Sequence, residues 1–107
     1  MAGFLQHVAI NTTRFEESVR FFEYLFEMEA TRMMGDAPNR KIWFRQGIQV
    51  NEVSEQIADG NQFDHLGFQV TDWQETRRKA AAMGCKDIEG KPHWFIMPDG
   101  IVIELKE

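Results

Sequence analysis

The chain has 107 residues and a mass of 12.5 kDa; 43% of its residues are hydrophobic and 27% are charged. These values are typical of one globular domain and exclude a disordered or fibrous chain. The net charge of −5, with no basic stripe, argues against nucleic acid as the main partner. No apolar run approaches the roughly 20 residues that a membrane span requires. The single cysteine and the lack of a secretory signal predict a cytoplasmic protein.

The first half of the sequence predicts a strand, a helix and three more strands. Residues 5–10 contain β-branched side chains in a short run that is typical of a strand. Apolar residues then recur at helical spacing, and Glu16 and Glu17 stand where the helix dipole favours acidic side chains. We therefore expect a helix over 14–27. The strands that follow are expected at 29–34, 41–45 and 48–53.

The second half repeats this order of elements. We expect a strand at 65–70, followed by a helix over 73–83. Thr71 and Asp72 can cap the start of this helix, and Gly84 can end it. The last strands are expected at 85–89, 93–97 and 101–105.

The two halves indicate an internal duplication. His65 follows His7 by 58 positions, and a strand and a helix recur in order around each of them. Each half therefore reads βαβββ. We expect a single domain over residues 1–107, composed of module 1 (1–53), a polar connector (54–60) and module 2 (61–107).

The duplication predicts a metal site. If the two modules pack about a pseudo-twofold axis, His7 becomes the partner of His65, and Gln49 becomes the partner of Glu104. Two imidazoles and one carboxylate form a facial set for a divalent transition metal and leave positions open for substrate. Gln49 would add a neutral oxygen or form part of the pocket wall. Glu52 is the alternative residue for that place. Successive side chains of a strand point to opposite faces, so Gln49 and Glu52, which are an odd number of positions apart, cannot both point inward.

Further candidates lie on the predicted strands. Trp43, Trp94 and Phe95 are candidates for substrate binding, although aromatic strand residues are more often core residues. His93 is a candidate for general acid or base catalysis, because imidazole side chains titrate near neutrality.

The order and spacing of the sequence motifs resemble those of the vicinal oxygen chelate superfamily. This superfamily includes glyoxalase I, methylmalonyl-CoA epimerase, extradiol dioxygenases and bleomycin-resistance proteins. The matching features are spread over nearly the whole chain: residues 7–10, residues 18–25, residues 65–70, Gly84, and the turn 98–100 that leads into residues 103–105. The resemblance implies an α+β fold, in which two βαβββ modules form a cup-shaped mixed sheet.

The resemblance also implies a function and its residues. A divalent metal ion (Ni, Zn, Mn, Co or Fe) would be held by His7, Gln49, His65 and Glu104. The enzyme would be a glyoxalase I-like lyase or an epimerase-like isomerase that chelates vicinal oxygens of a small metabolite and stabilises an enediolate-type intermediate. Glu104 or Glu52 would be the catalytic base. The strand 41–45 has no acidic residue where epimerases of this superfamily place a catalytic glutamate, which argues against epimerase activity.

Two other functions stay open at this point. A non-catalytic drug-binding protein of the bleomycin-resistance type would use the sheet as an aromatic-lined groove, without the metal set. An extradiol-type dioxygenase would use ferrous iron with the same two histidines and carboxylate, although such enzymes are generally longer. The expected partners are a small-molecule substrate and a second copy of the chain. A homodimer is expected because short chains of this superfamily commonly pair, and sedimentation tests this. No membrane partner is expected.

Overall fold

The computed structural model describes residues 3–55 and 62–107. Contacts divide the chain into two compact units: the first unit is residues 7–64, and the second unit is residues 1–6 together with 65–107. Most of the predicted connector 54–60 lies outside the described residues. The division into modules 1–53 and 61–107 stays a prediction.

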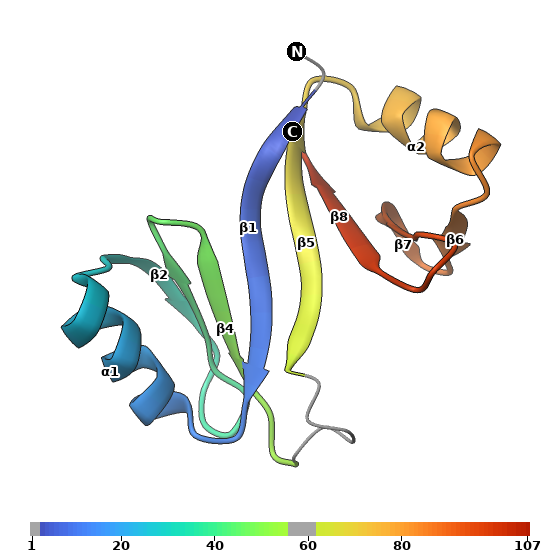
Figure 1. Cartoon of the computed structure of the whole chain (residues 1–107). Helices are drawn as coiled ribbons and strands as arrows, with labels where there is room; N and C mark the ends of the chain where they lie inside the picture. The colour runs from blue at the N-terminus through green and yellow to red at the C-terminus, as the bar shows by residue number, and fades with distance from the viewer. Residues whose placement is uncertain (1–2, 56–61) are drawn as a thin grey trace. The chain divides into compact units, whose positions relative to one another are not determined.

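The elements follow the order βαβββ twice (Figure 1). The first run is β1 (Gly3–Thr12), α1 (Phe15–Phe26), β2 (Ala30–Met34), β3 (Lys41–Phe44) and β4 (Ile48–Glu52). The second run is β5 (Phe63–Val70), α2 (Trp73–Ala82), β6 (Lys86–Ile88), β7 (Lys91–Ile96) and β8 (Val102–Lys106). Every predicted helix and strand is present, with bounds that differ from the predicted ones by at most two residues. The α+β class is therefore confirmed.

The two runs pair their strands in the same way. In the first, the strand order is β2-β3-β4-β1; β1 is parallel to β4, and the other pairs are antiparallel. In the second, the order is β5-β8-β7-β6, with β5 parallel to β8 and the other pairs antiparallel. Each βαβββ run thus forms a mixed set of four strands, as a duplicated module would.

Helix α1 packs against its strands through one apolar face. Phe15 of α1 is buried with Ile42, Phe44 and Val50 of β3 and β4. The rings of Phe22 and Phe44 lie 5.9 Å apart. In this core, one face of β3 and β4 packs against α1. Because side chains alternate along a strand, the intervening residues of β3 and β4 point to the opposite face.

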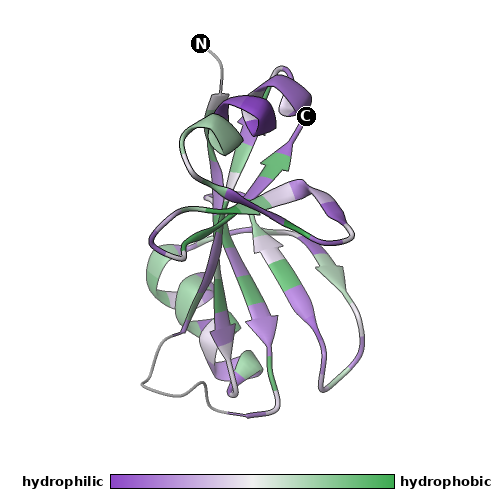
Figure 2. Ribbon diagram, turned by 90° about the vertical axis from the view of Figure 1, so that its right-hand side faces the viewer, coloured by the Kyte–Doolittle hydropathy of each residue, from purple (hydrophilic) through white to green (hydrophobic). Residues whose placement is uncertain are grey.

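Helix α2 begins at the predicted residue and ends one residue before the predicted end. The Asp72 carboxylate accepts a hydrogen bond from the backbone N–H of Glu75 at 3.1 Å, which satisfies one of the unpaired donors of the first turn. Gly84 follows the helix with φ of +92°, a conformation that favours glycine. Ala80 is the buried residue of α2, and it packs with Val70, Phe95, Ile103 and Leu105. Figure 2 shows α2 largely in the colour of hydrophilic residues, consistent with this narrow buried face.

Candidate metal centre

The strands of the second unit have one apolar face and one polar face. Phe95 of β7 and Ile103 of β8 are register partners in the core beside α2. Trp94 and Glu104, the neighbouring pair in register, therefore lie on the opposite face. Leu66 and Phe68 of β5 also contact the core, so the alternating residue His65 lies on the polar face with Trp94 and Glu104.

His65 and Glu104 meet on this polar face. Nε2 of His65 lies 3.3 Å from Oε1 of Glu104, and the two side chains are only 4% and 20% exposed. The Trp94 ring packs on the imidazole at a centroid distance of 4.6 Å, nearly edge to face. β5 and β8 position the pair, because Gly67 and Glu104 are partners in their parallel register.

The His65–Glu104 geometry suits two ligands of one metal ion. Ligand atoms held at about 2.0–2.2 Å from an ion, at tetrahedral or octahedral angles, lie roughly 3.0–3.5 Å apart. The observed 3.3 Å falls within that range. Imidazole nitrogen and carboxylate oxygen also form a donor set that divalent transition metals accept. Without an ion, the contact becomes an ion pair only if His65 is protonated.

The first unit has a comparable polar face. Ala9 and Asn11 of β1 pair in register with Gln49 and Asn51 of β4. These positions alternate with residues such as Val50 that face α1. His7, which precedes Ala9 by two positions on the same strand, shares their face. His7 and Gln49 are 4% exposed, and Asn11 and Asn51 are 7% exposed.

The side-chain amides of Gln49, Asn51 and Asn11 form a chain of hydrogen bonds on this face. Of these three residues, only Gln49 was predicted as a site residue. Gln49 Nε2 donates to Asn51 Oδ1 at 2.8 Å, and Asn51 Nδ2 donates to Asn11 Oδ1 at 3.2 Å. Asn11 Nδ2 then donates to Oδ1 of Asp64 at 3.0 Å. A signal was present in the sequence, since Asn51 follows Gln49 and Asn11 follows His7 at even spacing. Even spacing puts strand residues on one face.

Both tryptophan candidates lie on polar faces. Trp43 of β3 is the register partner of Gln49, and it is half-buried. The guanidinium carbon of Arg32 lies 5.4 Å from the centre of its ring. Trp94 packs on His65 in the second unit. Their positions are compatible with the substrate-binding role that the sequence suggests.

His93 and Phe95 lie on the face of β7 that is directed towards α2. Phe95 is 8% exposed and belongs to the core beside α2. His93 shares its strand face and stacks on Trp73, the first residue of α2, at a centroid distance of 4.1 Å. Because side chains alternate along β7, neither residue lies on the face that holds Trp94 and Glu104. The substrate-binding role of Phe95 and the acid or base role of His93 stay predictions, and any such role would be exercised away from Trp94 and Glu104.

Glu52 is engaged in a structural ion pair. Its two carboxylate oxygens accept hydrogen bonds from Nε and Nη2 of Arg40, each at 2.8 Å, and the backbone N–H of Arg40 adds a third bond at 3.1 Å. The Arg40 side chain also lies over the ring of Phe15, 4.6 Å from its centroid. The hydrogen bond from Arg40 lowers the pKa of Glu52 to about 2. A carboxylate of such low basicity is poorly suited to be the catalytic base.

Because of this ion pair, we expect the free energy of unfolding to decrease as the pH falls below about 5. The pKa of Glu52 is lowered on folding, so its stabilising effect is complete above the ordinary value of 4.5 and is lost as the pH falls towards 2. The Glu52→Gln variant should therefore be less stable than the wild type at pH 7, and the difference should shrink between about pH 5 and pH 2. Urea unfolding at several pH values measures this. A difference that stays constant over that range would contradict the assignment.

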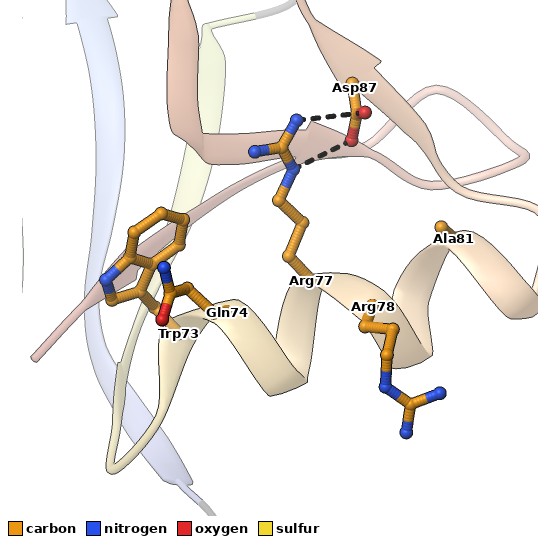
Figure 3. Close-up of a pocket in the computed structure, with 6 residues that line it drawn as sticks. All are labelled: Trp73, Gln74, Arg77, Arg78, Ala81 and Asp87. Atoms are coloured by element: carbon orange, nitrogen blue, oxygen red, sulfur yellow. Dashed lines mark hydrogen bonds and ion pairs between the residues drawn. The ribbon is translucent and has the colours of Figure 1, made fainter.

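A surface pocket on the second unit is a weaker candidate site. It has a volume of about 340 Å³ (Figure 3), and its lining is Trp73, Gln74, Arg77, Arg78, Ala81 and Asp87. Arg77 pairs with Asp87 at 2.9 Å, and Arg78 pairs with Glu75. The hydrogen bond from Arg77 holds the pKa of Asp87 below its usual value. Since both guanidinium groups already have carboxylate partners, the pocket offers no strong site for an anion.

Solved structures share this fold. The chain is similar to methylmalonyl-CoA epimerase from Streptomyces coelicolor in complex with 2-nitronate-propionyl-CoA, with a TM-score of 0.75 and 14% identity over 98% of this chain and 96% of that chain. It is similar to methylmalonyl-CoA epimerase from Mycobacterium tuberculosis, with a TM-score of 0.71 and 16% identity over 94% of this chain and 85% of that chain. It is also similar to the Mn(II)-bound glyoxalase from Novosphingobium aromaticivorans, with a TM-score of 0.69 and 19% identity over 94% of this chain and 37% of that chain.

These similarities confirm the predicted fold, which this chain shares with methylmalonyl-CoA epimerases and with a glyoxalase. Comparison of the sequence with family models and with curated proteins gave no match. Among the described residues, neither helix is long and apolar enough to cross a membrane.

Proposed function

We propose that this chain is a metal-dependent enzyme of the glyoxalase type, which binds a small oxygen-rich metabolite through two neighbouring oxygens. The observation that carries this proposal is the contact of 3.3 Å between the buried His65 and the half-buried Glu104. A shared fold alone does not determine function. The proposal therefore depends on these side chains and draws only secondary support from the Mn(II)-bound glyoxalase of the same fold.

The proposed ligand set extends to the first unit. In this proposal, His7 of the first unit would join His65 and Glu104 as the third ligand. The set of two imidazoles and one carboxylate fits a divalent ion such as Mn, Fe, Co, Ni or Zn. Gln49, buried on the polar face of the first unit, would add an amide oxygen. When bound, such an ion supplies Lewis-acid polarisation of the substrate oxygens.

The other residues of the polar faces suggest how the chain would treat a substrate. Trp43 and Trp94 would provide apolar walls, which exclude water and strengthen electrostatic interactions at the site. Of the two proposed catalytic carboxylates, Glu104 contacts an imidazole on a polar face, whereas Glu52 is held by the guanidinium of Arg40. We therefore assign to Glu104, as a carboxylate that substrate would displace from the ion, the movement of a proton at the carbon beside the substrate oxygens.

Proton exchange tests this function. Chelator-treated protein is loaded in turn with Mn, Fe, Co, Ni and Zn and incubated in D₂O with 2-hydroxy carbonyl compounds and with methylmalonyl-CoA. We expect metal-dependent deuterium incorporation beside the carbonyl group, detected by NMR. A protein that binds none of the five metals would contradict the proposal. Tight ligand binding that is unaffected by chelator would instead support a binding protein, and oxygen uptake with a catechol would support a dioxygenase.

A further inference from the structure

We propose that Asn51, Asn11 and Asp64 are positioning residues that fix the orientation of the Gln49 amide. Through them, Gln49 presents its carbonyl oxygen, rather than its NH₂ group, on the polar face of the first unit. The ligand role of that oxygen rests on the function proposed above. The orientation itself does not, because it follows from hydrogen bonds within the first unit.

The bonds form a continuous chain from a buried amide to an exposed carboxylate. Gln49, Asn51 and Asn11 are each at most 7% exposed. Successive donor–acceptor distances are 2.8, 3.2 and 3.0 Å, and the chain ends at Oδ1 of Asp64. The register of β1 and β4, which pairs Asn11 with Asn51, brings the two asparagine amides together.

The carboxylate of Asp64, at the end of the chain, determines the donor and the acceptor in each hydrogen bond of the chain. An ionised carboxylate only accepts hydrogen bonds, so Asn11 must turn its NH₂ group towards Asp64. Its carbonyl oxygen then faces Asn51 and can only accept, which makes Asn51 the donor of the next bond. The oxygen of Asn51 in turn faces Gln49, which must donate through Nε2. The remaining oxygen, Oε1 of Gln49, is thereby directed away from the chain.

This direction matters for a metal ligand. An amide coordinates a hard or borderline cation through its oxygen, whereas its NH₂ group only donates hydrogen bonds. Rotating the Gln49 amide would place its carbonyl oxygen against Oδ1 of Asn51 in a buried place, which is costly. The chain therefore holds a flexible side chain in the one orientation that can bind a cation.

A double-mutant cycle tests the direction of the chain in metal-free protein. Gln49→Glu places a second acceptor against Asn51 Oδ1, and at pH 8 this should lower the folding equilibrium constant about tenfold or more. Asp64→Asn supplies an amide at the far end, which can donate. The whole chain can then reverse, so in the Asp64→Asn background the loss caused by Gln49→Glu should shrink to about threefold or less. Chemical unfolding of the four proteins, with chelator present, measures both losses.

Two further cycles control for a failure to fold and for the change of charge alone. If Gln49→Glu does not fold, Asn51→Asp takes its place, because the new carboxylate would face Asn11 Oδ1 and Asp64→Asn would again relieve the conflict. Gln74→Glu makes the same change of charge at an exposed position of α2, and its effect should be independent of Asp64→Asn. Additive effects of Gln49→Glu and Asp64→Asn, or of Asn51→Asp and Asp64→Asn, would overturn the proposal.

Mn(II) titration separates this inference from the proposed function. We expect Asp64→Asn to weaken Mn(II) binding severalfold, since the orientation of Gln49 is no longer fixed, and Gln74→Glu to leave binding unchanged. Coupling in the cycle without Mn(II) binding by the wild type would support the positioning chain and argue against the metal function. Mn(II) binding with an additive cycle would support the metal function and overturn the positioning chain.

Discussion

Replacing Glu104 with glutamine is expected to lower the Mn(II) affinity of the chain by more than about a hundredfold. The substitution keeps the shape of the side chain but removes its negative charge. Loss of groups that only orient metal ligands costs about 10–100-fold in affinity, and loss of a charged ligand should cost more. Isothermal titration of chelator-treated protein measures the change, and the proton exchange proposed above should disappear with it.

Glu89→Gln is the matched control for this variant. Glu89 is exposed in the turn between β6 and β7, so the same change of charge occurs away from the proposed ligands. Its Mn(II) affinity should equal that of the wild type. If Glu104→Gln and Glu89→Gln bound Mn(II) equally well, Glu104 would not be a ligand, and its contact with His65 would be a structural ion pair only.

Replacing Phe44 with alanine should produce the largest loss of stability. Phe44 is 4% exposed and packs with Phe15, Ile42 and Val50 between α1 and the strands of the first unit. Truncation of a buried phenylalanine removes its apolar contacts and leaves a cavity, at a cost of about 3–5 kcal/mol. This is a large part of the free energy of unfolding of a domain of this size. Urea unfolding followed by circular dichroism measures it.

Tyr24→Ala is the control on the outer side of α1. Tyr24 is 75% exposed, so its truncation should change the free energy of unfolding by about 0.5 kcal/mol or less. A similar loss for Phe44→Ala and Tyr24→Ala would mean that the apolar contacts between α1 and β3 do not stabilise the first unit as described.

The fold could be predicted from the sequence because its signals are local. Apolar residues at helical spacing define α1, and the Asp72 cap and Gly84 define the ends of α2. Such signals lie within a few residues of the structure that they determine. The duplication then supplied what local patterns cannot, because the repeated βαβββ order indicated how the two halves correspond.

The candidate site was harder to predict, because it depends on partners that are distant in sequence. Alternation along a strand correctly indicated that Gln49 and Glu52 lie on different faces of β4. The same rule, applied to the adjacent residues Trp94 and Phe95, would have shown that only one of them can share a face with Glu104. The ion pair between Glu52 and Arg40 could not be predicted from the sequence, since the two residues are brought together only by the pairing of neighbouring strands. The hydrogen bond from Asn11 to Asp64 likewise joins residues 53 positions apart.

The location of a bound Mn(II) ion would show whether these side chains are metal ligands. Crystals grown with Mn(II) would be measured at a wavelength at which manganese scatters anomalously. We expect one strong anomalous peak per chain, coordinated by His7, His65 and Glu104, with the carbonyl oxygen of Gln49 as a further ligand. A well-ordered chain with no anomalous peak at these side chains, or with Mn(II) bound only elsewhere, would contradict it.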